Sequence, residues 1–212
     1  GSVCSPIIAN IYMHYVLVWW FKEKIQPRLR GFSGLVVYAD DFVVCFQHRS
    51  EAKIFYEHLK KRMAFFGLEM EESKTRLINF GRFATINRRD KGEGKPETFT
   101  FLGFTHYCST GRNGQFRVKR KTSKKKFAKK CRELNITIRD MRVWRLADII
   151  RKLNQILVGY YHYYGITDNS RSLELMYHHV RRMLFYWLNR SSNRKSYSWE
   201  GFNDMMKNFP LK

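Results

Sequence analysis

The stretch GLVVYADDFVVCF, which begins at Gly34, limits the folds open to this chain more than any other. Residues 35–39 and 42–46 are rich in Val, Tyr and Phe, the side chains that favour strands. Between the two runs stand Asp40 and Asp41, and Asp tolerates the backbone geometry of a tight turn. The pattern predicts a β-hairpin whose two-residue turn is formed by these aspartates.

Two adjacent carboxylates repel each other, and the hairpin contains no Lys or Arg to offset the repulsion. A bound cation would offset it. Magnesium prefers oxygen ligands and binds substrate phosphates, and two such ions stabilise the attacking and leaving oxygens in phosphoryl transfer. Because paired acids are also common in exposed turns, the pattern alone leaves a metal site and an exposed acidic turn as equal alternatives.

The rest of the first half predicts helices packed on a sheet. Residues 6–21 open with a proline, which suits the first turn of a helix. The apolar part of this segment, 11–21, is shorter than the roughly 18 residues of a membrane span, so we expect a buried helix. Apolar residues recur at helical spacing over 52–66, and Gly67 is placed to end that helix. Further strands are predicted over 76–80, 98–102 and 104–107, with a polar loop over 87–97.

The second half is predicted to be helical. The turn-rich segment STGRNGQ, 109–115, marks the boundary between two regions, 1–108 and 109–212. Beyond this boundary, apolar side chains recur at helical spacing in three successive segments, which predicts a helical bundle. These segments are 127–141, 146–164 and 173–187.

Aromatic side chains near the end of the second helical segment have two predicted roles. Tyr160, Tyr161 and Tyr164 fall on its apolar side and are predicted to pack in the core. His162 and Tyr163 point to the other side, so they are the candidates for stacking on nucleic-acid bases.

Charge indicates a polyanionic partner. The chain carries 40 Lys and Arg against 18 Asp and Glu, a formal net charge of +22. Most of the excess lies beyond residue 108. Each phosphate that a basic side chain neutralises releases a condensed counterion, so nucleic acid is the expected partner.

The cysteines and the last histidines show no metal-binding pattern. The cysteines are far apart and form no CxxC or CxxH cluster, so we expect buried thiols in a reducing compartment. They are Cys4, Cys45, Cys108 and Cys131. His178 and His179 have no cysteine or carboxylate partner at metal spacing, which predicts a structural or RNA-facing role.

Ordered motifs in the chain resemble those of a known family. The motifs are GSVCSPIIANIYM (1–13), YADD (38–41), GLEMEESKTRLINF (67–80) and FTFLGFTHY (99–107). Together with 147–207, which resembles a thumb or maturase X domain, they are similar to the group II intron-encoded reverse transcriptases. The resemblance implies an α+β fold: 1–108 would form part of a polymerase palm, an antiparallel sheet with packed helices and the YADD hairpin, and 109–212 an all-α thumb and maturase bundle.

The resemblance implies a polymerase site around the hairpin. Asp40 and Asp41 match the catalytic aspartates that hold Mg²⁺ near the primer 3′ hydroxyl and the departing pyrophosphate, and Tyr38 and Ala39 precede them in the palm. Lys74 lies in a segment that often supplies a lysine near the triphosphate, and a solvated helix-end lysine is the equal alternative. The residues implied on the nucleotide and template side are Ser5, Pro6 and Asn10.

Contacts with primer and RNA are implied further along the chain. Leu102, Gly103 and Phe104 match the primer-grip turn, the alternative being an ordinary turn that needs a glycine for packing. The basic run 117–130 would normally be a solvated charged face. Beside an apolar helical stripe and polymerase motifs, it is predicted to contact RNA phosphates. The predicted contact residues are Lys119, Arg120, Lys121, Lys124, Lys125, Lys126, Lys129 and Lys130.

The match is incomplete at the start of the chain. Family members complete the metal site with a third carboxylate from an earlier palm strand, and no Asp precedes Asp40. Ser2 stands where the family usually has a glycine, which limits how closely the backbone can be approached there. We therefore expect a fragment that lacks the fingers and the first palm aspartate.

Three functions are consistent with the sequence. The first is an RNA-directed DNA polymerase and intron maturase, present as a fragment that is inactive alone; the others are a non-catalytic RNA-binding splicing module and an inactive remnant. Expected partners are structured intron RNA, an RNA template with a DNA primer, dNTP, and either a second copy or the N-terminal half of the same protein, but no membrane. Without a secretory signal at its start, the protein is expected in the bacterial cytoplasm, an organelle being the second choice.

Overall fold

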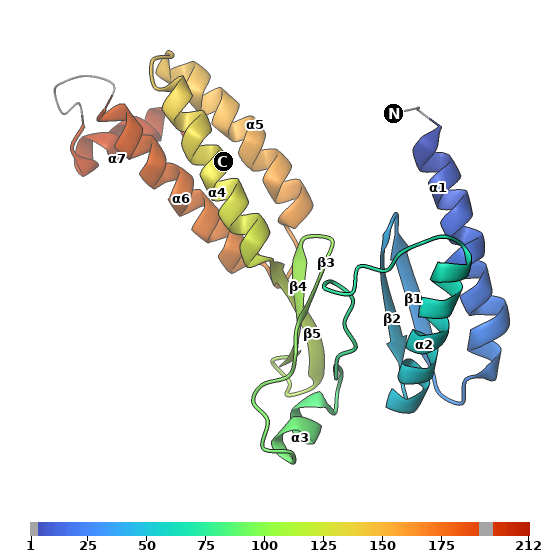
Figure 1. The fold of residues 1–212 in the computed structure, drawn as a ribbon. Helices are drawn as coiled ribbons and strands as arrows, with labels where there is room; N and C mark the ends of the chain where they lie inside the picture. The colour runs from blue at the N-terminus through green and yellow to red at the C-terminus, as the bar shows by residue number, and fades with distance from the viewer. Residues whose placement is uncertain (1–3, 191–196) are drawn as a thin grey trace. The chain divides into compact units, whose positions relative to one another are not determined.

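The computed structural model describes residues 4–190 and 197–212, so Ser2 lies outside the described residues. The chain forms two compact units, Gly1–Phe101 and Leu102–Lys212. Helices and small antiparallel sheets occur together (Figure 1), which confirms the predicted α+β class. The division falls after residue 101 rather than after the predicted 108, because hydrogen bonds and ring contacts join the segment from Leu102 onward to helices of the second unit.

The first unit begins with a long helical segment followed by a hairpin. The helical segment consists of α1 (Ser5–Met13), the π-helical turns η1 (His14–Trp19) and η2 (Phe21–Ile25), and the 3₁₀ turn η3 (Gln26–Arg28). The strands β1 (Ser33–Tyr38) and β2 (Asp41–Phe46) pair in antiparallel fashion. The remaining elements are α2 (Arg49–Phe65), α3 (Ala84–Arg89) and β3 (Phe99–Phe101).

Helices cover one face of the hairpin. Side chains of a strand alternate between its two faces. On the covered face, Leu35, Val37, Phe42, Val44 and Phe46 pack against buried residues of η1, η2 and α2. On the other face, Val36 and Tyr38 are exposed. The hairpin therefore has one core face and one open face.

The first helix is more exposed than the sequence predicted. No residue of α1 is buried, and the side chains of Ile7 and Ile8 expose 62% and 63% of their surface. Burial begins at Val16 and Leu17, where the helical segment meets the core that it shares with α2 and the hairpin. The expectation of a buried helix over 11–21 is thus wrong for its first part.

Arg62 of α2 joins that helix to the π-helical turn η1. Its Nε donates a hydrogen bond to the carbonyl oxygen of Val16 at 2.5 Å, and its Nη2 donates to that of Tyr15 at 3.2 Å. The guanidinium also lies over the rings of Trp20 and Phe66, 4.8 Å from each centroid. Burial lowers the pKa of Arg62. This side chain is therefore committed to holding two helices together.

The connection from α2 to β3 differs from the prediction. Residues 76–80 do not form a strand. The backbone N–H of Asn79 and the side chain of Arg76 instead donate to the Glu97 carboxylate, at 3.2 and 3.1 Å. The loop that was predicted over 87–97 begins within α3, and Arg88 of this helix forms an ion pair with Glu93. Carboxylates thus supply the partners that a neighbouring strand would otherwise provide.

The second unit combines a hairpin with a helical bundle. β4 (Phe104–Thr110) pairs with β5 (Phe116–Thr122), so part of the basic run forms a strand that was not predicted. The helices are α4 (Lys124–Met141), α5 (Leu146–Tyr164), α6 (Ser170–Leu188) and α7 (Trp199–Asn208). They share one core. Tyr160 is buried in it, and burial raises the pKa of Tyr160 to about 12.

Asn169 ties the hairpin of the second unit to its helices. The side chain is 1% exposed. Its Oδ1 accepts a hydrogen bond from the backbone N–H of Thr122 at 2.8 Å, and its Nδ2 donates to Thr122 Oγ1 at 2.8 Å and to the Tyr164 carbonyl at 2.9 Å. Next to this site, the N–H of Ser123 donates to the Gly103 carbonyl at 2.9 Å. The bonds fix the end of β5 against the α5–α6 connection.

Over the part of the chain that the structure describes, no helix is both long and apolar enough to cross a lipid bilayer.

Candidate active site and nucleic-acid interface

The acidic tip of the first hairpin lies one residue earlier than the sequence predicted. Tyr38 pairs with Asp41, so the two-residue turn is Ala39-Asp40, and Asp41 is the first residue of β2. Ala39 has φ of 53°, a conformation that costs energy for any residue except glycine. The strand register decides the position of the turn, and Ala39 rather than an aspartate takes the left-handed conformation.

Asp40 and Asp41 are both open to solvent. Each is exposed, and among the described residues neither carboxylate has an ion-pair partner within 4.0 Å. Alternation along β2 places Asp41 on the same side as Val43 and Cys45, away from the face that packs on the helices. The tip therefore presents two uncompensated negative charges beside the open face of the hairpin.

The residues implied on the nucleotide side lie on α1. Ser5 and Pro6 form its first turn, and Asn10 follows Pro6 by four residues, so the latter two share one side of the helix. Figure 1 shows the start of α1 and the tip of the β1–β2 hairpin at the same end of the first unit. The hydroxyl of Tyr12 donates to the Phe66 carbonyl at 2.6 Å, which joins α1 to the end of α2 at this same end of the unit.

Lys74 lies in a turn after α2 and is exposed. Its backbone N–H donates to the Glu71 carbonyl at 3.0 Å. The Glu71 carboxylate accepts a 2.6 Å hydrogen bond from the Ser73 hydroxyl, and this bond, with the charge of Lys74, lowers the pKa of Glu71. Lys74 thus occupies a turn, whereas the alternative interpretation placed it at a helix end.

The turn at Leu102 and Gly103 is held by the end of α5. Both residues have positive φ, 49° and 77°, the backbone geometry of a type I′ turn. The hydroxyl of Tyr163 donates to the Leu102 carbonyl at 3.0 Å. Its ring stacks on Phe104 with centroids 5.9 Å apart, and the Tyr164 ring meets Phe104 at 5.2 Å. The candidate primer-grip residues therefore contact helix α5 directly.

Gly103 allows a test of this packing. A Cβ atom added to it would lie 3.0 Å from the Tyr164 hydroxyl, whereas one added to Gly114, with nearly the same φ of 75°, would meet nothing within 4 Å. We expect Gly103→Ala to lower the free energy of unfolding by about 2–3 kcal/mol and Gly114→Ala by about 1 kcal/mol. Denaturant titration of the two variants measures the difference. Equal losses would show that Tyr164 moves aside without cost.

The basic run spans β5 and the start of α4. Lys119, Arg120 and Lys121 lie on β5, and Lys121 Nζ is 5.2 Å from the centroid of the Tyr107 ring. Lys129 and Lys130 pair with Glu133 at 3.8 and 3.7 Å. The middle of the run forms the first turn of α4 and is exposed, and it consists of Lys124, Lys125 and Lys126.

Lysines in the first turn of α4 oppose the electrostatics of the helix. The N-terminus of a helix carries a partial positive charge, so acids stabilise this turn and cations destabilise it. The first turn of α4 contains no acid. The Lys126 N–H donates to the Ser123 hydroxyl at 3.4 Å, while the other N–H groups of this turn and its lysines attract anions. A bound phosphate would relieve the repulsion between the lysines and the helix end. This arrangement favours a phosphate-binding role over a merely solvated face.

Comparison with protein families identifies the family of the chain. Residues 1–106 match the family described as "Reverse transcriptase (RNA-dependent DNA polymerase)". The chain belongs to the reverse transcriptase family. Residues 124–203 match the "Group II intron, maturase-specific domain", which places the chain among the reverse transcriptases and maturases encoded by group II introns. Comparison with curated proteins gave no match.

The two acids at the hairpin tip have the chemistry of metal ligands. Carboxylate oxygens are the ligands that Mg²⁺ prefers, and Asp40 and Asp41 provide them without a competing protein cation. Within 4–190 and 197–212, however, no group of three or more His, Cys, Asp or Glu side chains is arranged to hold a metal ion. The residues fit an ion whose other ligands are water, substrate phosphate or a carboxylate from elsewhere.

Several aromatic and histidine side chains have partners that the sequence did not predict. Tyr163 is 55% exposed as predicted, but its hydroxyl and ring are committed to Leu102 and Phe104. His178 has a carboxylate partner, Glu174, at 3.8 Å, and His179 Nε2 lies 3.2 Å from the Cys131 carbonyl oxygen. Two of the cysteines, Cys4 and Cys45, are exposed rather than buried. Apart from its position near the end of α5, no feature of the sequence predicted that the Tyr163 hydroxyl would bind the turn at 102–103.

Proposed function

We propose that the tip of the β1–β2 hairpin is the metal-binding part of an RNA-directed DNA polymerase active site. The observation that carries the proposal is the pair of exposed, uncompensated carboxylates, Asp40 and Asp41, inside the segment that matches reverse transcriptases. Mg²⁺ bound there would activate the primer 3′ hydroxyl and stabilise charge on the departing pyrophosphate. The two aspartates would supply carboxylate ligands, while Tyr38 and Ala39 set the position of the turn.

The neighbouring residues would bind the incoming dNTP and the template. Ser5, Pro6 and Asn10 are accessible on α1, at the end of the unit that holds the hairpin tip. Lys74 is exposed and would neutralise the charge that develops on the departing pyrophosphate as the bond between the α- and β-phosphates breaks. Residue Asn10 would act through its amide, which both donates and accepts hydrogen bonds.

The second unit would bind primer and RNA. We assign Leu102, Gly103 and Phe104 to primer contact, supported by a turn that is fixed by two tyrosines of α5. The eight basic residues from Lys119 to Lys130 would contact phosphates of structured intron RNA. The lysines at the positive end of α4 support this assignment, because their placement opposes helix stability and suits an anion.

A primer-extension assay on the purified chain separates the candidate functions. We expect no extension of a DNA primer on an RNA template with Mg²⁺, because two adjacent carboxylates without a third ligand do not hold two ions at the spacing that phosphoryl transfer needs. We expect salt-sensitive RNA binding in the same preparation.

The outcomes of this assay are distinct. Metal-dependent extension by the chain alone would show that the described acids suffice. Preferential binding of group II intron RNA without extension would support a maturase module. Binding to all RNAs with equal affinity would identify a basic remnant, since non-specific affinity follows charge alone.

A further inference from the structure

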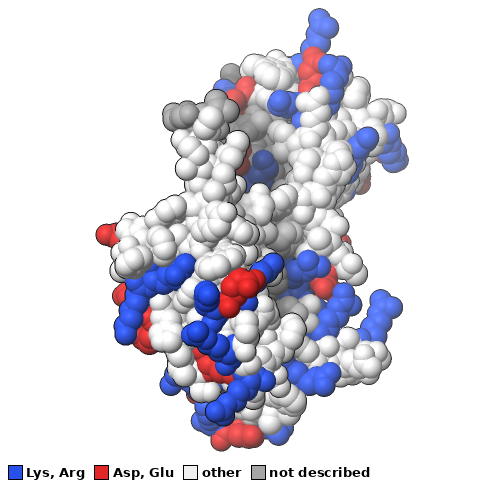
Figure 2. Space-filling view, turned by 90° about the vertical axis from the view of Figure 1, so that its right-hand side faces the viewer, with Lys and Arg blue, Asp and Glu red and all other residues white. Residues whose placement is uncertain are grey.

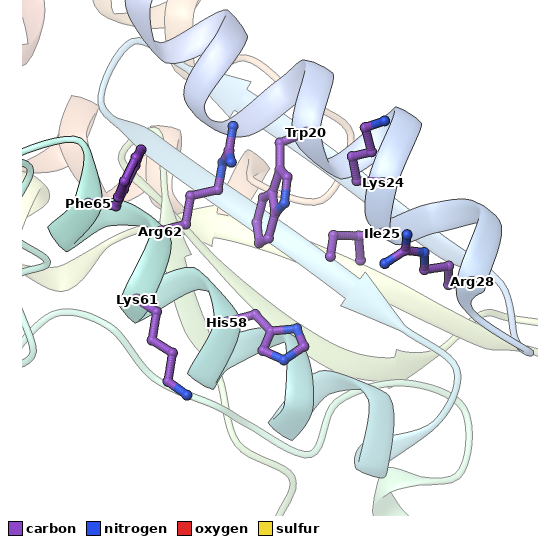
Figure 3. Close-up of a pocket in the computed structure, with 8 residues that line it drawn as sticks. All are labelled: Trp20, Lys24, Ile25, Arg28, His58, Lys61, Arg62 and Phe65. Carbon is purple, nitrogen blue, oxygen red and sulfur yellow. The ribbon is translucent and has the colours of Figure 1, made fainter.

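A basic groove lies in the first unit between the helical segment η1–η3 and α2. Its volume is about 350 Å³, which lies within the range of small-ligand sites. Figure 3 shows Trp20, Lys24 and Arg28 on one side and His58, Lys61 and Phe65 of α2 on the other. The two helices cover the core face of the hairpin, so the groove is separate from the open face beside Asp41.

The lining of the groove is cationic. No acidic residue lines it, and Lys24, Arg28 and Lys61 are exposed without an ion-pair partner within 4.0 Å among the described residues. Lys60, which precedes Lys61 on α2, differs because its ammonium group pairs with the Glu72 carboxylate at 3.0 Å. Figure 2 shows acidic side chains interspersed with basic ones over one face of the molecule. A groove lined by cations without any acid therefore differs from that face.

The floor of the groove consists of packed aromatic rings and the guanidinium of Arg62. The Trp20 ring stacks on Phe55 with centroids 5.7 Å apart, and Arg62 lies over Trp20 at 4.8 Å. Arg62 is occupied by the carbonyls of η1, so it supplies charge to the floor without being a free donor. The groove is thus largely formed before any ligand binds.

Phe65 gives the groove its second chemical feature. The ring is 83% exposed and meets only the edge of Phe66 within the aromatic contacts of the described residues, at 5.2 Å. It follows Lys61 by four residues, so the ring and the ammonium group lie on the same side of α2. An exposed ring beside free cations suits an unstacked base and its phosphates.

We propose that this groove binds a single-stranded segment of RNA, with phosphates at Lys24, Arg28 and Lys61 and a base stacked on Phe65. The proposal rests on the proposed function of RNA binding and adds a second contact, on the first unit. Single-stranded RNA is favoured over duplex RNA because bases within a duplex are stacked on one another and present no free face to a phenyl ring.

The test uses the whole chain and a short single-stranded oligoribonucleotide containing 5-iodouridine, which forms photo-cross-links to aromatic side chains. We expect a cross-link in the tryptic peptide 63–74, which contains Phe65. Phe65→Ala should abolish that cross-link and weaken binding about tenfold. Phe32→Ala is the matched control, because Phe32 is 78% exposed in the same unit but outside the groove.

Charge is tested separately. Arg28→Gln with Lys61→Gln should lower the slope of log affinity against log salt by about 0.7 for each lost contact. Lys22→Gln with Lys53→Gln is the control of equal charge, because both residues are exposed and lie outside the groove. Equal effects of the two pairs, or an unchanged cross-link in Phe65→Ala, would overturn the groove assignment. The same loss on duplex RNA would overturn it as well.

Failure of the groove and failure of the proposed function give different results. If the unaltered chain bound RNA and the groove variants behaved as their controls, only the groove assignment would fail. If the unaltered chain bound neither single-stranded nor structured RNA, the proposed function would fail and the groove assignment with it.

Discussion

Asp40→Asn or Asp41→Asn will reduce magnesium-dependent primer extension by about a thousandfold or more in the polymerase that carries these residues. Each change removes a charged oxygen ligand of the metal ion, and such an ion stabilises the transition state by several kcal/mol. A loss of about 4 kcal/mol corresponds to a thousandfold lower rate. Both side chains are exposed, so the fold should be unaffected. The measurement is the single-turnover rate of nucleotide addition on an RNA template.

Asp90→Asn is the matched control for these changes. Asp90 is an exposed acid in the same unit, at the end of α3 and away from the hairpin. It should retain the full rate. RNA affinity should be the same in all three variants, since none removes a basic residue. Full extension activity in either hairpin variant would refute the metal-binding role of the pair.

Replacing Lys124, Lys125, Lys126 and Lys129 with Gln will lower RNA affinity about a hundredfold near physiological salt. Each lost phosphate contact flattens the slope of log affinity against log salt by about 0.7–0.9. The same variant should unfold at a temperature equal to or above that of the unaltered chain. Three of the four lysines lie in the first turn of α4, where a cation costs roughly 0.3–1 kcal/mol, and this gain outweighs the loss of the exposed pair between Lys129 and Glu133. Weaker binding with undiminished stability is the signature of residues retained for a ligand.

A second variant of equal charge controls for bulk electrostatics. The variant replaces four lysines that are exposed in the first unit and do not belong to the basic run, Lys22, Lys53, Lys91 and Lys95. If their replacement with Gln weakened binding as strongly, the run would be only part of a diffuse positive field. A loss that is larger for the parent intron than for unrelated RNA would indicate recognition rather than charge alone.

The helices of the second unit were the most predictable part of the fold. The apolar period over 146–164 matches α5, Leu146–Tyr164, at both ends, because Ile149, Leu153 and Leu157 must all face one core. Gly165 follows the last helical residue. Periodicity of this kind is fixed by burial, so it is visible in the residues themselves.

Elements whose partners lie far away in the sequence were less predictable. Residues 76–80 have strand-like composition, yet a strand needs a neighbour, and Glu97 takes the hydrogen bonds instead. The strand β5 was hidden inside a basic run, because Lys and Arg carry no strong strand propensity. Pairing with β4, not local preference, makes it a strand.

The candidate site shows the same limit. Composition and motif marked Asp40 and Asp41 as candidates, but they did not predict the position of the turn, because register is set by pairing along the whole hairpin. The groove beside α2 had no motif at all. Its residues come from two helices, and only the packing of η1 and η2 against α2 brings them together.

The π-helical turns after α1 have a consequence for sequence comparison. An α-helix advances by about 100° per residue, and a π-helical turn holds more residues than an α-helical one. Deleting one residue from His14–Trp19 would therefore let this segment close into an ordinary α-helical turn, and the direction of α1 relative to Phe21 and the buried residues that follow would change little. Asn10 and Pro6 would keep their direction while the core stayed unchanged. A relative with a single-residue gap in this segment would therefore present the same side of its first helix.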